Sequence, residues 1–327
     1  MKKVTFLIGV MACIATSLFA QEKETFQPSG KVFMTVFSNF NTTISDGTST
    51  SAFALERAYL GYEYNLSPNF SGKLNFDVGN PGVGKLEMTA YIKNAYIQYK
   101  TGGLSVQFGL IGTTSFKTME GLWGNRYIEK SFQDAYKFNA SADLGVSAAY
   151  KITDWASADL IIANGEGYKN LQADNQFRTG LGLTLTPTKP LIVRAYYDMM
   201  GATNTQTTAS AAIGYKTKAI TAAVEYNLQN NVENTSGKEL SGYSAYANYA
   251  AIKNLKVFAR YDMLTSAILT GETANWNVSK DGSLILAGIE YSPVKGVKFA
   301  PNFRFWTPAD AAKTNVSSFF LNCEIKF

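Results

Sequence analysis

Histidine is absent from this chain of 327 residues, and cysteine is nearly so, with only Cys13 and Cys323. Without histidine, neither a Ser-His-Asp triad nor a Cys-His pair can form, which excludes the commonest nucleophilic hydrolases. Two cysteines, one of them in the first twenty residues, cannot build a disulfide framework or a cysteine metal site. No metal-ligand spacing or phosphate-binding loop is evident either, so we expect no cofactor and no enzymatic activity.

Long apolar runs are also missing after residue 20, although 46% of the residues are hydrophobic and only 17% are charged. No later stretch approaches the about 20 residues that a membrane-spanning helix needs. The net charge of +5 is mild, whereas nucleic-acid binding asks for a concentrated basic face, so we expect no nucleic-acid partner. The chain is instead rich in Phe (21), Tyr (19) and Gly (27), a mixture typical of half-buried strands joined by turns.

The first twenty residues differ from the rest of the chain. Lys2 and Lys3 precede an apolar segment from Val4 to Phe19, and a polar run begins after Ala20. This pattern predicts a cleaved secretory signal peptide over residues 1–20, followed by one domain over residues 21–327. An alternative is a lipoprotein acylated on Cys13, which would leave an unusually apolar start to the mature chain. Removing the signal peptide leaves 28 basic and 25 acidic residues, a net charge of +3.

Short blocks of alternating apolar and polar residues fill the mature chain. Examples run over residues 70–78, 104–110, 177–185, 220–228 and 297–305. Successive side chains on a strand point to opposite faces, so each block has one apolar and one polar face. We count about sixteen such blocks, an even number inside the range of outer-membrane barrels.

The links between the blocks alternate in length. Every second link is a tight turn, such as Ser67-Pro68-Asn69, Thr101-Gly102-Gly103 or Ile252-Lys253-Asn254. The other links are longer and polar, as at Thr42 to Ser51, Gly165 to Asn175, Gln229 to Leu240 and Thr265 to Asp281. We therefore predict an all-β protein, a transmembrane antiparallel β-barrel of about 16 strands in lipid, with short periplasmic turns and long extracellular loops. Its location would be the outer membrane of a Gram-negative bacterium.

The last block is the sharpest feature of the pattern. Every second residue from Phe319 to Phe327 is apolar, so the chain ends on an aromatic residue of the lipid-facing side. An alternating strand with a terminal aromatic resembles the signal that the barrel assembly machinery reads. We expect that machinery to be a partner through Phe327. Pro301 does not suit its predicted strand, because it cannot donate to the ladder, so we expect a bulge or a misassigned strand there.

The longest link runs over residues 112–139 and is aromatic and charged, which argues against disorder. We interpret it as a candidate constriction loop that folds into the lumen. The alternative is an extracellular loop that packs on the rim or on a neighbouring barrel.

Charged residues on the polar faces are the candidates for function. The pore-lining candidates on strands and in the long link are Arg57, Lys73, Arg126, Lys130, Arg178, Arg194, Arg260 and Arg304. As a set they could form an electrostatic path for anions. Each one taken singly could merely solvate a water-filled lumen and pair with an acidic neighbour.

Six motifs stand out in the first half of the chain: Glu56 to Glu63, Phe70 to Leu74, Lys93 to Tyr99, Val106 to Leu110, Arg126 to Phe132 and Ala142 to Val146. Together they resemble the phosphate-selective porin family (porins of the O and P type). The resemblance implies a homotrimer of sixteen-stranded barrels with an inward constriction loop and basic rows in the lumen. Because basic and acidic residues are nearly balanced in this chain, we expect a weak anion preference rather than strong phosphate selectivity.

The sequence therefore predicts a porin for passive diffusion of small hydrophilic solutes or ions. Glycines expected to point inward, such as Gly61, Gly180 and Gly182, favour it because they leave room. The alternative is a structural or adhesive barrel whose loops bind outside partners. A protease built on an acidic pair such as Asp143 and Asp159 is a further, weaker alternative, since lumen carboxylates usually line pores. A channel for hydrophobic substrates would need an N-terminal hatch, and residues 21–29 are too short and polar for one.

Overall fold

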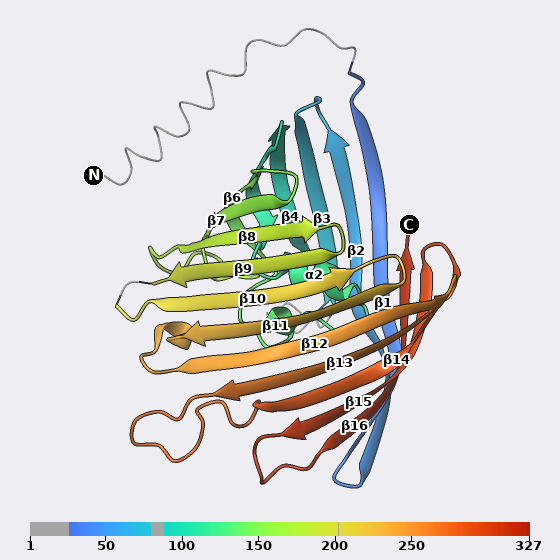
Figure 1. Cartoon of the computed structure of the whole chain (residues 1–327), viewed down its shortest axis with the longest axis vertical. Coiled ribbons are helices and arrows are strands. Elements are labelled where there is room, and N and C mark those ends of the chain that lie inside the picture. The colour runs from blue at the N-terminus through green and yellow to red at the C-terminus, as the bar shows by residue number, and fades with distance from the viewer. Residues whose placement is uncertain (1–25, 80–87, 202) are drawn as a thin grey trace.

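The computed structural model describes residues 26–79, 88–201 and 203–327. Sixteen antiparallel strands form one closed barrel in which each strand pairs with its neighbours along the chain and β1 pairs with β16 (Figure 1). The strands are β1 Ser29–Ser45, β2 Thr48–Asn65, β3 Phe70–Gly79, β4 Thr89–Thr101, β5 Leu104–Gly112, β6 Ala142–Lys151, β7 Ala156–Ala163, β8 Arg178–Thr188, β9 Leu191–Met200, β10 Gln206–Lys216, β11 Ile220–Asn230, β12 Glu239–Ile252, β13 Leu255–Ser266, β14 Gly282–Val294, β15 Val297–Pro308 and β16 Val316–Lys326. The predicted fold class is confirmed. The predicted signal peptide, residues 1–20, lies outside the described residues.

Alternation in the sequence becomes alternation between lumen and exterior. In β12, Ser244 and Tyr246 are buried inside the barrel, while Tyr243 and Ala245, which alternate with them, are exposed outside. Each strand pairs with two neighbours and the sheet closes on itself, which is how a barrel satisfies backbone groups in lipid. A chain of modest hydropathy can therefore present a continuous apolar exterior. In the described ranges, no helix is long and apolar enough to cross a bilayer.

The lengths of the links confirm the predicted sorting, with one exception. The expected long loop from Thr42 to Ser51 is wrong, because β1 and β2 run through it and meet at the two-residue turn Asp46-Gly47. Both turn residues have positive φ, 49° and 70°, as a type I′ hairpin requires. Asp-Gly is a strong signal for that turn, and the flanking Thr and Ser residues suit strands, so the polarity of the segment was misleading.

Pro301 does lie inside strand β15, and no bulge accommodates it. It stands opposite Leu321 in an unbroken register with β16. On the β14 side, the pairs Gly288–Asn302 and Tyr291–Phe299 belong to one register. Pro301 lies between them and has no paired residue on β14. The ladder thus tolerates one missing donor, with neither the bulge nor the misassigned strand that the sequence suggested.

The final strand closes the barrel as its pattern predicted. Phe319, Leu321 and Phe327 are 55%, 48% and 69% exposed and point outward. The backbone groups of Phe327 exchange hydrogen bonds with those of Met34 in β1, at 2.9 and 3.1 Å. The end of the chain is therefore part of the seam that joins the first strand to the last.

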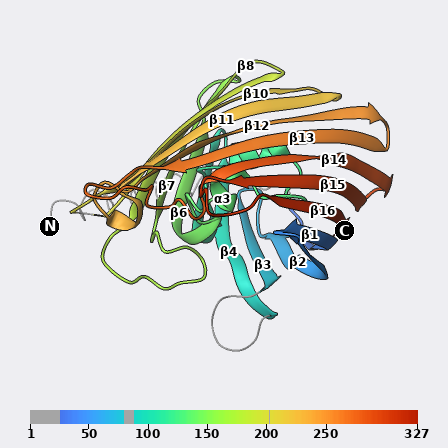
Figure 2. The ribbon, with the colours of Figure 1, turned by 90° about the horizontal axis from the view of Figure 1, so that it is seen from below.

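The segment between β5 and β6 runs inside the barrel. It carries two short helices, α2 Lys117–Trp123 and α3 Phe132–Ala135, and α2 contacts β10, β11 and β12. Figures 1 and 2 show this segment within the curve of the strands. We call residues 113–141 the inner loop.

Candidate functional site

Helix α2 has one face for the barrel wall and one for the lumen. Met119, Leu122 and Trp123 are buried, and Trp123 packs edge-on against Tyr246 and Phe258 of the wall. Lys117 on the opposite face is exposed. Gly124 ends the helix in the left-handed conformation (φ 67°), where glycine pays no steric penalty. The helix is thus held sideways against β10–β12.

Wall side chains donate hydrogen bonds to carbonyl oxygens along the inner loop. The donors come from β9 to β16, and the carbonyl acceptors lie on Thr114, Met119, Gly121, Trp123, Tyr127, Ile128, Lys130 and Phe138. An irregular segment leaves such carbonyls without ladder partners, and burying them unpaired is costly. The polar inner face of β9–β16 is therefore used to fix the loop.

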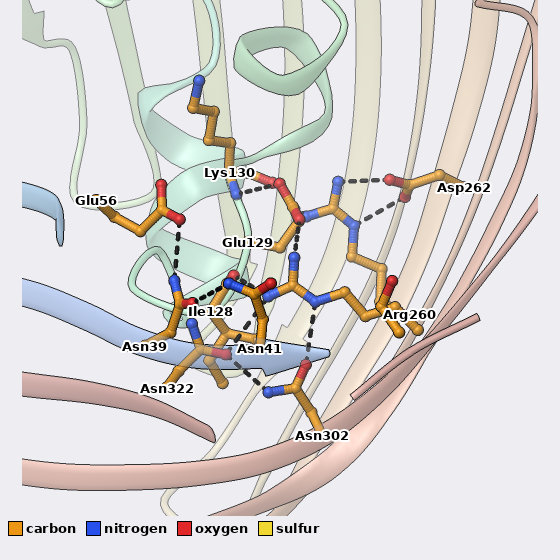
Figure 3. Close-up of polar contacts among 12 residues, drawn as sticks. Asn39, Asn41, Glu56, Ile128, Glu129, Lys130, Arg260, Asp262, Asn302 and Asn322 are labelled. Atoms are coloured by element: carbon orange, nitrogen blue, oxygen red, sulfur yellow. Dashed lines mark hydrogen bonds and ion pairs between the residues drawn. The ribbon is translucent and has the colours of Figure 1, made fainter. Parts of the chain in front are cut away.

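The tightest part of this attachment surrounds Ile128, Glu129 and Lys130 (Figure 3). Arg260 binds Asp262 through two hydrogen bonds of 2.8 and 2.6 Å and also donates to the Lys130 carbonyl. Arg304 pairs with Glu129 at 2.7 Å and donates to the Ile128 carbonyl. Each guanidinium group thus donates both to a carboxylate and to a loop carbonyl. The several donors of arginine suit this double contact better than the single ammonium group of lysine does.

Three of the pore-lining candidates are covered by the loop or by their own ion pairs. Arg178, Arg194 and Arg260 are only 7%, 2% and 2% exposed. Arg178 pairs with Asp198, and Arg194 pairs with Asp159 and donates to the Thr114 carbonyl. Arg304 is also mostly buried beneath the loop. The structure places these four arginines behind the inner loop, on the β8–β15 side.

Asp159, one half of the acidic pair considered for a protease, forms that ion pair with Arg194. The other half, Asp143, accepts hydrogen bonds from the backbone of Leu144 and Gly165. Among the described residues, no group of three or more potential ligands is arranged to hold a metal ion.

The remaining four candidates lie on the open side of the loop. Arg57 pairs with Asp77 at 2.5 Å, and Lys73 pairs with Glu63 at 2.8 Å. Arg126 binds both Glu120 (3.0 Å) and Asp134 (2.8 Å) within the loop. Arg57, Arg126 and Lys130 surround a small cavity of about 80 Å³ together with Arg304.

A larger cavity of about 510 Å³ lies between the inner loop and the wall of β1–β5, with β16 beside it. We call it the passage. The loop contributes Phe116, Lys117, Glu120 and Arg126, and the wall contributes charged, amide and aromatic side chains. Lys117 and Lys326 on its lining are exposed, so the passage is open to solvent.

Glu120 is a loop carboxylate on this passage. Burial raises its pKa above the ordinary value of a glutamate, and Arg126 beside it opposes the rise. The carboxylate of Asp134 also raises this pKa, while the positive charges of Lys93 and Arg57, like that of Arg126, lower it. The charge of the passage therefore depends on pH through a group that no strand pattern identified.

The sequence pattern missed Lys93, Lys117 and Lys326, all of which line the passage. Lys93 was missed because β4 has a bulge there, so that Lys93 and Asn94 both reach the lumen. Lys117 lies in a helix inside the long link, and a strand pattern does not predict its direction. Lys326 follows the parity of β16 and could have been found from it.

The expectation that inward glycines leave room is wrong. A Cβ on Gly61 would lie 2.2 Å from the ring of Phe33, and one on Gly180 would meet the hydroxyl of Tyr196 at the same distance. A Cβ on Gly182 would likewise lie 2.2 Å from the guanidinium of Arg194. These glycines make space for neighbouring side chains, so the opening depends on where the loop lies.

No known protein-family model matches the chain, and no curated protein matches its sequence. Solved structures do match its fold. The high-pH structure of OprB from Pseudomonas putida has a TM-score of 0.72 at 9% identity, over 91% of this chain and 94% of that one.

Two further solved structures match this chain over the whole of their own length. The outer membrane channel DcaP of Acinetobacter baumannii has a TM-score of 0.64 at 13% identity, covering 94% of this chain and 100% of that one. The trimer form of OmpT, an outer membrane protein of Vibrio cholerae, has a TM-score of 0.60 at 14% identity, covering 91% and 100%. At such low identity these likenesses establish the fold alone, a closed sixteen-stranded barrel similar to those of these outer-membrane proteins.

Proposed function

We propose that this protein is an outer-membrane porin through which small hydrophilic solutes and ions diffuse passively. The observation that carries the proposal is the solvent-open passage of about 510 Å³ beside the inner loop, inside a closed sixteen-stranded barrel. A barrel with a structural or adhesive role alone has no need of a charged opening beside a loop whose carbonyl groups are held mainly by one wall, β9–β16.

In this proposal the inner loop, which contains most of the candidate segment 112–139, is the constriction. Its hydrogen bonds to β9–β16 fix the side of the lumen on which it lies, and its contacts with Phe37 of β1 and Lys93 of β4 limit the passage on the other side. Lys73 and Arg126 line the passage, and Arg57 and Lys130 lie beside it. Three arginines behind the loop, Arg194, Arg260 and Arg304, act on the solute by holding the loop. Arg178 acts through Asp198, which accepts a hydrogen bond from Asn139 of the loop.

We further propose a weak anion preference, with no catalytic step. Five basic and two acidic side chains line the passage, and the two acids are each paired with a base. The excess of positive charge favours anions, and the water-filled surroundings keep the preference small.

Residues 1–20 are proposed to be a signal peptide that is removed on export, and the barrel assembly machinery to insert the mature chain through Phe327. A homotrimer is proposed because the motifs resemble those of trimeric porins and because the similar OmpT structure is a trimer form. Light scattering of the detergent-extracted protein measures the oligomeric mass. A monomer would contradict this part alone.

The test of the channel is conductance in a planar lipid bilayer, with the reversal potential measured across a salt gradient. We expect stepwise openings and a reversal potential on the anion-selective side. Folded protein that inserts without conducting would leave the structural or adhesive role as the better explanation. Cation selectivity would contradict the anion preference while leaving the porin intact.

A further inference from the structure

The acidic side chains that line the passage have basic partners, whereas three of the basic side chains have no acidic partner within the described ranges. Glu120 is bound to Arg126 at 3.0 Å, and Glu324 is bound to Lys298 at 2.9 Å. Lys93, Lys117 and Lys326 have no carboxylate within 4.0 Å among the described residues. The passage therefore offers free ammonium groups and few free carboxylates.

Lys93 is the least solvated of these ammonium groups. It is 7% exposed, donates to the Ser141 hydroxyl and lies 3.5 Å from the ring centre of Tyr168. A hydroxyl and a ring face compensate a buried ammonium only in part, because neither carries a full negative charge. A bound anion at the passage would supply that charge.

Aromatic rings lie on the same lining as these lysines. Phe33, Tyr59 and Tyr96 on the β1–β5 wall are half-buried, and Phe116 of the loop lies across from them. Tyr59 meets Phe37 edge-on with ring centres 6.0 Å apart. A hydrated inorganic anion gains little from such surfaces, whereas a flat apolar body gains from contact with ring faces and edges.

The size of the passage also favours an organic solute. A volume of about 510 Å³ lies within the roughly 300–1,000 Å³ of sites that enclose small organic molecules. An inorganic anion would occupy a small part of it and remain surrounded by water.

From these observations we propose that the passage selects small organic anions that join one carboxylate to one aromatic ring, over inorganic anions such as phosphate. This inference rests on the proposed porin function and names its substrate class. The carboxylate is received by Lys93 and Lys117, and the ring lies against Tyr59 and Tyr96.

The probe is 4-hydroxybenzoate, compared with its neutral counterpart 4-hydroxybenzamide and with inorganic phosphate. In the bilayer, we expect 4-hydroxybenzoate to interrupt the open-channel current at concentrations about tenfold lower than either comparison compound requires, since a hydrogen bond to a charged group contributes that much. In detergent, saturation-transfer NMR on the folded protein should detect its bound ring protons whether or not the protein conducts.

The variants separate the charge from the rings. Lys93→Met and, independently, the exposed Lys117→Gln should each weaken the interruption by the acid by about tenfold, and Tyr96→Leu should weaken acid and amide alike. Lys218→Gln, which removes a lysine in the β10–β11 turn, is the matched control and should change nothing.

The outcomes distinguish this inference from the porin proposal. Equal interruption by phosphate or by the amide would overturn the substrate class while leaving a working channel. Absence of conductance would overturn the porin function, and the NMR signal of the acid against the amide would still decide whether the passage binds aromatic anions.

Discussion

Glu120 makes the selectivity of the passage depend on pH. Its pKa is raised by burial, so the carboxyl takes up a proton at higher pH than an ordinary glutamate does. Lowering the pH from 7 toward 4 should remove this negative charge and raise the anion preference. A unit charge about 10 Å from the ion path in water contributes roughly 0.4 kcal/mol, so we expect a change of about twofold in the permeability ratio.

The measurement is the reversal potential as a function of pH. Glu120→Gln should show the higher anion preference already at pH 7, with a flatter pH dependence. Asp154→Asn is the control, because Asp154 lies fully exposed in the β6–β7 turn. A pH profile of Glu120→Gln identical to that of the unmodified protein would assign the titration to another group.

Arg260 is predicted to act on the loop rather than directly on ions. It is buried with Asp262 and holds the Lys130 carbonyl. Arg260→Ala would leave Asp262 charged and without its main partner, at a cost of about 3–5 kcal/mol in the free energy of unfolding. We expect the inner loop to loosen, seen as protease cleavage within residues 113–141 and as noisier open-channel current.

A double substitution tests that explanation. Arg260→Met combined with Asp262→Leu removes both charges and should recover most of the lost free energy of unfolding, because an apolar pair of similar volume often replaces a buried ion pair. Loop cleavage should stay above that of the unmodified protein, since the bond to Lys130 is absent. An unchanged loop in both variants would mean that Arg260 does not fasten it.

At the scale of elements, α2 packs directly on β10 where Leu122 lies over Gly214. A Cβ on Gly214 would lie 2.7 and 2.9 Å from the two methyl groups of Leu122, with no other atom as close. Gly214→Val should therefore push α2 toward the passage and lower the single-channel conductance. Overpacking of this kind also costs about 1–3 kcal/mol of stability.

Leu122→Ala in the Gly214→Val background should restore the conductance, because it removes the methyl groups that clash. Gly121→Ala is the control within the same helix, since a Cβ there meets no atom within 4 Å. A fall in conductance that Leu122→Ala does not relieve would place its cause outside the α2–β10 contact.

The elements also show what the sequence could and could not predict. Period-two alternation predicted the strands, because each strand has one lumen face and one lipid face. It failed at Asp46-Gly47, where a polar strand resembled a loop, and at Lys93, where a bulge changes the parity. The burial of Arg194 and Arg260 was beyond its reach, because it depends on which wall the inner loop lies against.

For the whole molecule, the last residue of the chain takes part in the seam that closes the barrel. Phe327 exchanges two backbone hydrogen bonds with Met34 and presents its ring outward. Deleting Phe327 removes both bonds at the seam between β16 and β1, together with the terminal aromatic. We expect a lower yield of folded barrel in the outer membrane, measured as the fraction that migrates as the compact form before boiling on an SDS gel.

Refolding in detergent separates the two roles of Phe327. Phe327→Tyr keeps the aromatic ring and the backbone bonds and should assemble normally in cells and in detergent. Phe327→Ala keeps the bonds alone, so it should refold in detergent yet assemble poorly in cells if the ring is recognised by the assembly machinery. If Phe327→Ala assembles as well as Phe327→Tyr, the seam bonds suffice, and the aromatic end of the chain serves only as contact with lipid.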